Sequence, residues 1–179
     1  MNVWKWLLHQ AGWTFAVNIP PTPKCVICVA PHTSNWDFVL GELAIRSVGM
    51  TASFLMKDTW FFFPMGYLMR ALGGIPVKRG AHTHVGESVA AEFSRHDHLW
   101  VAVTPEGTRK RNAQWHRGFL HIAHTADVPV VLGYIDYGTR EVCIDRIFEA
   151  SDDVDADMAA IKRYYAGRTA RHPENFTTE

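Results

Sequence analysis

The sequence has little of what marks several large classes of protein. Three cysteines among 179 residues are an odd number and form no disulfide framework. Lysine plus arginine and aspartate plus glutamate number 18 each, so no net charge attracts the whole chain to nucleic acid or acidic lipid. Repeats, low-complexity tracts and interdomain linkers are also lacking. We therefore expect a single domain over residues 1–179, in which any anion site is local.

Two of the cysteines lie close together in the sequence. Cys25 and Cys28 fall in a predicted strand, where positions three apart face opposite sides of the sheet. We interpret them as reduced thiols of the core. The alternative, a redox pair, would need a helix that begins just after the first cysteine.

Residues 1–17, MNVWKWLLHQAGWTFAV, predict a short amphipathic helix. Its apolar residues recur at the spacing of one helical face: Trp4, Leu7, Leu8, Ala11 and Phe15. The segment lacks the cleavage site of a signal peptide, and it is shorter and more polar than a spanning helix of about 20 apolar residues. Two interpretations stay open: the tryptophans place the helix in the headgroup layer of a membrane, or the helix packs on the domain's own core.

Short apolar runs alternate with helical patterns along the rest of the chain. We expect strands at residues 25–30, 51–56, 74–78, 99–103, 128–134 and 141–148. We expect helices at about residues 35–48, 58–72, 83–96, 115–126 and 152–166. This alternation predicts an α/β fold, with a mostly parallel, twisted sheet that carries helices on both faces. Residues 168–179 are predicted to form a loosely ordered tail.

The segment PHTSNWD follows the first predicted strand and places His32 five positions before Asp37. Ligands of parallel sheets bind beyond the carboxyl ends of the strands, so we expect chemistry in this loop. A histidine can take a proton from a hydroxyl that attacks a thioester, and a carboxylate can hold the imidazole in one tautomer. Ser34 or Asn35 can cap a helix here, which brings Asp37 close to His32. Taken alone, this spacing is more often explained by an acidic residue that favours a helix N-terminus.

Two later strand ends carry basic residues. The segment GGIPVKR ends in Lys78 and Arg79, and TPEGTR ends in Arg109. In TPEGTR, residues 106–108 can turn tightly, so that backbone N–H groups or the Thr108 hydroxyl face a bound polar head. Arginine can bind an anionic oxygen in a bidentate way. A lone VKRG segment is more often only a solvated strand end.

The order of these segments resembles the glycerolipid acyltransferase family, which includes the 1-acyl-sn-glycerol-3-phosphate acyltransferases. That family carries a His-x4-Asp motif, a Gly-Ile block that ends in arginine, Phe-Pro-Glu-Gly-Thr-Arg-Ser and a Val-Pro block. Here the four appear in order as HTSNWD, GGIPVKR, TPEGTR and VPVV, over about residues 25–135. Thr104 stands where phenylalanine is usual, and Lys110 where serine is usual. The resemblance implies a glycerol-3-phosphate acyltransferase-like fold with His32 and Asp37 as catalytic residues. It also implies these substrate-binding residues: Lys78, Arg79, Glu106, Gly107, Thr108 and Arg109.

The resemblance implies an enzyme of phospholipid biosynthesis. It would move a fatty acyl group from an acyl-CoA or acyl-carrier-protein thioester to the hydroxyl of a lysophospholipid such as 1-acylglycerol-3-phosphate. The acceptor would attack the thioester directly, so no acyl-enzyme, cofactor or metal is expected. We expect a cytoplasmic protein, peripheral on the inner face of the membrane. The alternatives are the same chemistry on another amine- or hydroxyl-bearing lipid, or a non-catalytic lipid-binding protein, which would not need the His32 and Asp37 pair.

Three other features are less specific. The aromatic segment 58–72 either lines an acyl-chain groove, touches the bilayer or forms a buried helix. The pair His82 and His84 and the histidines at 116, 121 and 124 lack a third metal ligand at a suitable spacing. RKRNAQWHR resembles a nucleic-acid patch, but the neutral charge balance argues against that function.

Overall fold

The computed structural model describes residues 2–77 and 85–179. Within these residues, seven strands form one sheet in the order β1-β7-β6-β2-β5-β3-β4. All neighbouring strands run parallel except β6 and β7, which are antiparallel. The mostly parallel sheet that the sequence predicts is therefore confirmed. The strands are β1 (Thr14–Val17), β2 (Lys24–Ala30), β3 (Ser53–Lys57), β4 (Gly74–Val77), β5 (Leu99–Val103), β6 (Val130–Asp136) and β7 (Glu141–Phe148).

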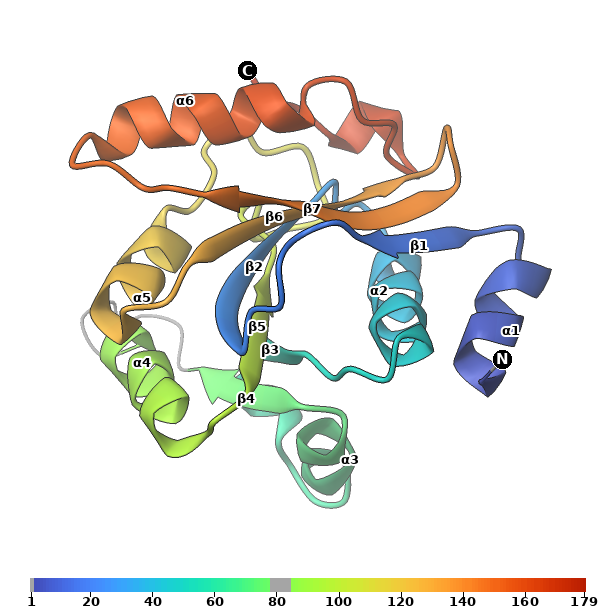
Figure 1. Ribbon diagram of the computed structural model, residues 1–179, viewed down its shortest axis with the longest axis horizontal. Coiled ribbons are helices and arrows are strands. Elements are labelled where there is room, and N and C mark those ends of the chain that lie inside the picture. Colours follow the sequence, from blue (N-terminus) through green and yellow to red (C-terminus); the bar gives the residue numbers. More distant parts are fainter. Residues whose placement is uncertain (1, 78–84) are drawn as a thin grey trace.

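Helices cover both faces of the sheet, as predicted. Figure 1 shows α4, α5 and α6 on one side of the sheet and α1 and α2 on the other. The helices are α1 (Val3–Gln10), α2 (Asn35–Ser47), α3 (Met65–Ala71), α4 (Val85–Arg95), α5 (Gly118–Ala126) and α6 (Val154–Tyr165). Among the described residues, none of these helices is long and apolar enough to cross a bilayer.

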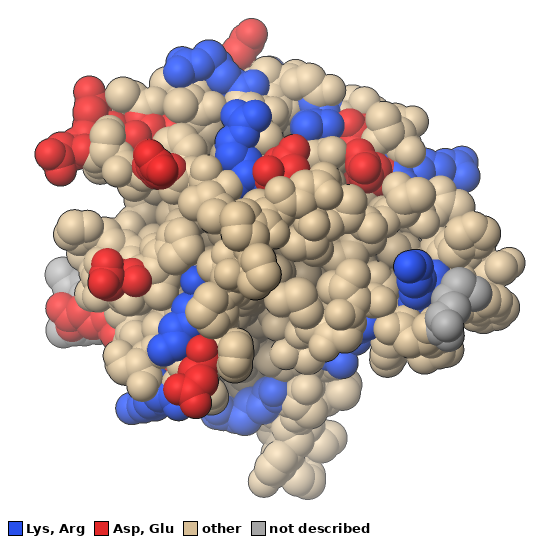
Figure 2. Space-filling model, in the orientation of Figure 1, with Lys and Arg blue, Asp and Glu red and all other residues tan. Residues whose placement is uncertain are grey.

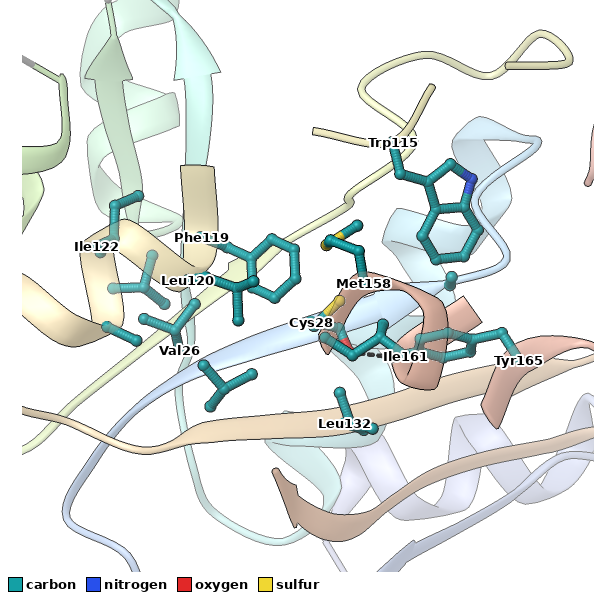
Figure 3. Packing of buried hydrophobic residues seen from close by; sticks show 14 of the residues in the cluster. Val26, Cys28, Trp115, Phe119, Leu120, Ile122, Leu132, Met158, Ile161 and Tyr165 are labelled. Atoms are coloured by element: carbon teal, nitrogen blue, oxygen red, sulfur yellow. Dashed lines mark hydrogen bonds between the residues drawn. The ribbon is translucent and has the colours of Figure 1, made fainter. Parts of the chain in front are cut away.

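Strand β2 lies in the middle of the sheet and sends alternate side chains into two cores. Val26 and Cys28 pack with α4, α5 and α6, whereas Cys25 and Ile27 pack on the opposite face, against α2. Both thiols are free, and burial raises the pKa of each to about 12. The interpretation of these cysteines as reduced core thiols is therefore confirmed. Figure 3 shows Cys28 in the first core, where its carbonyl oxygen accepts a hydrogen bond of 2.6 Å from the Tyr165 hydroxyl.

The prediction of one helix over residues 1–17 is correct for the first half of this segment and wrong for the second. The helix ends at Gln10, and Gly12 adopts a φ of +74°, a left-handed conformation that turns the chain back toward the sheet. Thr14–Val17 then forms the edge strand β1, parallel to β7. Within α1, Leu8 packs in the core next to α2, but Val3, Trp4, Trp6 and Leu7 stay exposed. The helix therefore packs on the domain and still presents an apolar surface to solvent.

The aromatic segment does not form the continuous helix predicted over residues 58–72. A short 3₁₀-helix, Asp58–Trp60, is followed by Pro64, which stands just before α3 and breaks the pattern. The segment is not buried either, because five of its large apolar side chains are exposed: Trp60, Phe62, Phe63, Tyr67 and Leu68. Figure 2 shows the α3 region as a projection that carries no visible charged residue at its tip.

The prediction of a loosely ordered tail over residues 168–179 is also wrong, because these residues pack against the domain. The Tyr137 N–H donates to the Thr169 carbonyl at 2.8 Å, and the His172 N–H donates to the Thr33 hydroxyl at 3.2 Å. Farther along, the indole N–H of Trp115 donates to the Thr177 carbonyl at 3.2 Å. We call residues 168–177 the C-terminal strap, because they run across the loops that follow β2 and β6.

Candidate active site

The carboxyl ends of three neighbouring strands define the candidate site. Strands β5, β2 and β6 lie side by side in the parallel part of the sheet, so the loops that follow them meet at one edge. These loops carry His32 after β2, Glu106 after β5 and Tyr137 after β6. The first two of these residues come from the predicted motifs, whereas Tyr137 does not.

The loop after β2 brings His32 and Asp37 together. Ser34 is the N-cap of α2 and Asp37 its third residue, and together they form a capping box. One Asp37 oxygen, Oδ2, accepts the backbone N–H groups of Thr33 and Ser34 at 2.7 Å each. The same oxygen lies 3.6 Å from Nδ1 of His32, longer than a hydrogen bond but close enough to attract the ring once it is protonated. Helix capping and the approach to histidine, which the sequence presents as alternatives, occur together.

The environment of His32 favours a neutral imidazole. Its side chain is 21% exposed, and burial lowers its pKa from the ordinary value of 6.5. The carboxylate of Asp37 acts in the opposite direction, and the charge of Arg109 lowers the pKa further. A histidine whose pKa lies below its ordinary value is unprotonated at neutral pH and can accept a proton. The Nδ1 atom faces Asp37, which leaves Nε2 as the nitrogen for an incoming hydroxyl.

Glu106 has an inward position that the sequence does not predict. Its side chain is only 3% exposed, and Oε2 accepts the backbone N–H of His32 at 2.9 Å. Burial raises the pKa of this carboxyl to about 7, the hydrogen bond from His32 lowers it, and the charge of Asp37 raises it. In this structure Glu106 therefore fixes the backbone of His32. Its predicted contact with substrate stays a prediction.

The tight turn expected in TPEGTR is present. Gly107 has a φ of +65°, and its N–H donates to the Thr104 carbonyl at 3.1 Å. A Cβ atom on Gly107 would lie 2.3 Å from the His116 ring, so only glycine fits here without movement. Asn112 supports the turn from outside, because its amide donates to the Glu106 carbonyl at 2.8 Å. The exposed Thr108 hydroxyl accepts the N–H of Lys110 at 3.3 Å, and its contact with a headgroup stays a prediction.

The basic groups of the predicted anion site are described only in part. Arg109 is exposed and donates a hydrogen bond to the side-chain oxygen of Asn35, the first residue of α2. Its guanidinium therefore lies beside the loop that carries His32. Lys78 and Arg79 lie outside the described residues, and so do His82 and His84. Among residues 2–77 and 85–179, no cluster of three or more histidine, cysteine, aspartate or glutamate side chains could hold a metal ion.

Tyr137 is the site residue that the sequence analysis missed. Its hydroxyl donates to Oδ1 of Asp37 at 2.7 Å, across 100 positions of sequence. The signal that could have found it is its position directly after β6, since the rule about carboxyl ends of strands applies to this strand as well. A single tyrosine after an apolar run is common, so this position alone does not indicate a site residue.

Comparisons with known proteins identify the class. A family model described as Acyltransferase matches residues 14–134, more than half of the chain, and the chain therefore belongs to the acyltransferase family. Among solved structures it is similar to the 1-acyl-sn-glycerophosphate (LPA) acyltransferase PlsC from Thermotoga maritima, with a TM-score of 0.55 and 20% sequence identity. That alignment covers 94% of this chain and 78% of PlsC. No curated protein matches the chain.

Glu106→Gln tests the buried carboxyl. In the wild-type protein the pKa of Glu106 is raised on folding, so its ionisation destabilises the folded state as pH rises from about 5 to 8. Glutamine stays neutral and can still accept the His32 N–H. We expect the stability of the wild type relative to the variant to fall by on the order of 2–3 kcal/mol over this range. Urea unfolding at both pH values measures the change.

The exposed Glu149 supplies the matched control, as Glu149→Gln. The difference in stability between the wild type and Glu149→Gln should be the same at pH 5 and at pH 8. A Glu106→Gln difference that is equal at pH 5 and pH 8 would contradict the raised pKa of this carboxyl.

Proposed function

We propose that the chain transfers a fatty acyl group from an acyl-CoA or acyl-carrier-protein thioester to the hydroxyl of a lysophospholipid such as 1-acylglycerol-3-phosphate. The observation that carries the proposal is the His32–Asp37 pair, 3.6 Å apart at the carboxyl end of the central strand β2. Membership of the acyltransferase family supports the reaction type and argues against a non-catalytic lipid-binding protein. The similarity to PlsC, a 1-acyl-sn-glycerophosphate (LPA) acyltransferase, supports the choice of acceptor class.

In the proposed reaction, Nε2 of His32 takes the proton of the acceptor hydroxyl as its oxygen attacks the thioester carbonyl. Asp37 holds the Nδ1 side of the ring and stabilises the imidazolium that forms. The tetrahedral intermediate then collapses, the C–S bond breaks, and the thiolate leaves with the proton that the imidazolium returns. An ester and a free thiol are the products, and no side chain is acylated.

Arginines supply the proposed contacts for the acceptor phosphate. Arg109 lies beside the first turn of α2, and its charge adds to the effect of burial in lowering the pKa of His32. We assign the phosphate to Arg109 together with Lys78 and Arg79, which follow β4, on the basis of the family resemblance. A guanidinium can bind two oxygens of one phosphate, which fixes orientation as well as charge. The second candidate keeps the same base and uses another amine- or hydroxyl-bearing lipid.

An acceptor panel distinguishes the two candidates. The full-length protein is incubated with a labelled acyl-CoA or an acyl-carrier protein, together with 1-acylglycerol-3-phosphate, its phosphate-free monoacylglycerol analogue or an amine-bearing lyso-lipid. Mass spectrometry identifies the products. We expect turnover to be highest with the phosphate-bearing acceptor, by about tenfold or more if charge-assisted bonds hold the phosphate. A preference for the phosphate-free or amine acceptor would support the second candidate instead.

His32→Ala tests the proposed base. We expect acyl transfer to fall by at least about 10²-fold, because a lost general base costs this much or more. The control is His124→Ala, since His124 is an exposed histidine in the last turn of α5, which leads to the amino end of β6 and not to the carboxyl ends of the strands. Both variants should keep the melting temperature of the wild type within a few degrees. Near-normal turnover by a folded His32→Ala protein would rule out this mechanism.

We also propose that the protein binds to the membrane surface from the cytoplasmic side. Contact with a membrane is supported by the apolar side chains that α1 leaves exposed, among them Trp6 at 46% and Leu7 at 39%. The exposed aromatic residues before and within α3 form a second such group. Tryptophan is favoured at the headgroup layer, where its ring is buried and its N–H stays hydrated.

The double variant Trp6→Ser/Leu7→Ser tests this location without removing β1. We expect its partition onto phospholipid vesicles to fall roughly tenfold, because the lost burial of the two side chains is worth about 1–2 kcal/mol. Moderate salt should have little effect on binding by the wild type, since apolar burial is not screened. Co-sedimentation at low and high salt measures both effects.

Leu8→Ala is the matched control, because Leu8 is the neighbouring residue and is only 2% exposed. It should lower the melting temperature and leave vesicle binding by the folded protein unchanged. Equal vesicle binding by the double variant and the wild type would refute the role of α1 at the membrane.

A further inference from the structure

Asp37 has a fixed partner at each of its two oxygens. Oδ2 accepts two backbone N–H groups and faces His32, whereas Oδ1 accepts the hydroxyl of Tyr137 at 2.7 Å. The carboxylate is only 2% exposed, so a lost donor could not easily be replaced by bulk water. Among the described residues, the Tyr137 hydroxyl is the one side-chain group that forms a hydrogen bond with Asp37, and the His32 ring lies beside the other oxygen.

Tyr137 is itself held on several sides. The Trp13 ring packs edge-on against it with ring centroids 4.8 Å apart, and Trp13, between α1 and β1, is buried in a cluster with Leu8 and Leu40. Its backbone N–H donates to the Thr169 carbonyl in the C-terminal strap. From the same strap, the guanidinium of Arg171 lies 6.0 Å from the centre of the Tyr137 ring. A side chain fixed in this way can hold the carboxylate at one orientation.

We propose that Tyr137 is a positioning residue that orients Asp37, and through it His32, for the acyl transfer described above. This inference rests on the proposed function for its kinetic consequences. By holding Oδ1, the hydroxyl keeps Oδ2 directed at the imidazole. It also offsets part of the negative charge that Asp37 presents to the ring, because the partly positive hydrogen of the hydroxyl lies against the carboxylate.

The expected pH effect follows from these charges. In Tyr137→Phe the Thr33 and Ser34 N–H groups still hold Oδ2 near the ring. The carboxylate then presents more of its negative charge to the imidazolium, and the pKa of His32 rises. Other elements supply ionisable groups around the pair, and the substitution leaves all of them in place: Glu106, Arg109 and Arg171. The acid limb of the pH profile for kcat/KM therefore shifts to higher pH in the variant.

Tyr137→Phe is the test, because it keeps the ring that packs on Trp13 and removes only the hydroxyl. We expect kcat to fall about tenfold with little change in KM for thioester or acceptor, and the acid limb to move upward by about half a pH unit. The matched control is Tyr164→Phe, which removes another tyrosine hydroxyl bonded to an aspartate, Asp145, between α6 and β7. The control should change neither kcat nor the pH profile.

A measurement independent of turnover keeps the inference separate from the proposed function. Imidazole resonances of His32, assigned by their loss in His32→Ala, report its pKa directly. We expect this pKa to rise in Tyr137→Phe and to stay unchanged in Tyr164→Phe. If no acceptor is acylated but the His32 pKa still rises, the proposed function fails and the link from Tyr137 to His32 stands. If transfer occurs and neither kcat nor the pKa of His32 changes in Tyr137→Phe, the positioning role is overturned, and Tyr137 only packs.

Discussion

A buried carboxylate needs a hydrogen-bond donor for each of its oxygens, and this requirement at Asp37 organises the site. Two donors are backbone N–H groups of the loop before α2, and the third is the Tyr137 hydroxyl from the end of β6. These three hydrogen bonds fix the start of α2, the path of the loop after β2, and the distance between that loop and the end of β6. The position of His32 beside the carboxylate follows from the same geometry.

At Glu106 the requirement for hydrogen-bond donors is met only in part. Glu106 is also a buried acid, yet among the described residues its carboxyl accepts one hydrogen bond, from the His32 backbone N–H, and burial raises its pKa to about 7. Asp37 is surrounded by donors, whereas Glu106 has few to offset its desolvation. Both acids act on His32, Asp37 at its ring and Glu106 at its backbone N–H.

The sequence allowed six of the seven strands, the helices α2, α4, α5 and α6 and the closeness of His32 to Asp37 to be predicted. Each of these depends on local spacing: alternating apolar runs, a capping residue, and chemistry at a strand end. The contacts made over long distances in the sequence could not be predicted. Tyr137 is 100 positions from Asp37, and β1 pairs with β7, which begins 124 positions after the end of β1. The strap, which is polar and rich in turn residues, looks like a loose tail, and its order comes from partners in distant loops.

The strap also has a consequence for how the protein is made. His32 and Asp37 are encoded early in the chain, but Thr169 and His172 contact the loops that surround them. On the ribosome, the loop after β2 emerges long before these late partners exist. Strands β2 and β5 can pair while the chain is still growing, whereas the surroundings of the site are completed only after the strap has left the exit tunnel. The first core is completed almost as late, because it needs Ile161 and Tyr165 of α6, so the core and the site are finished together once the C-terminal residues are free.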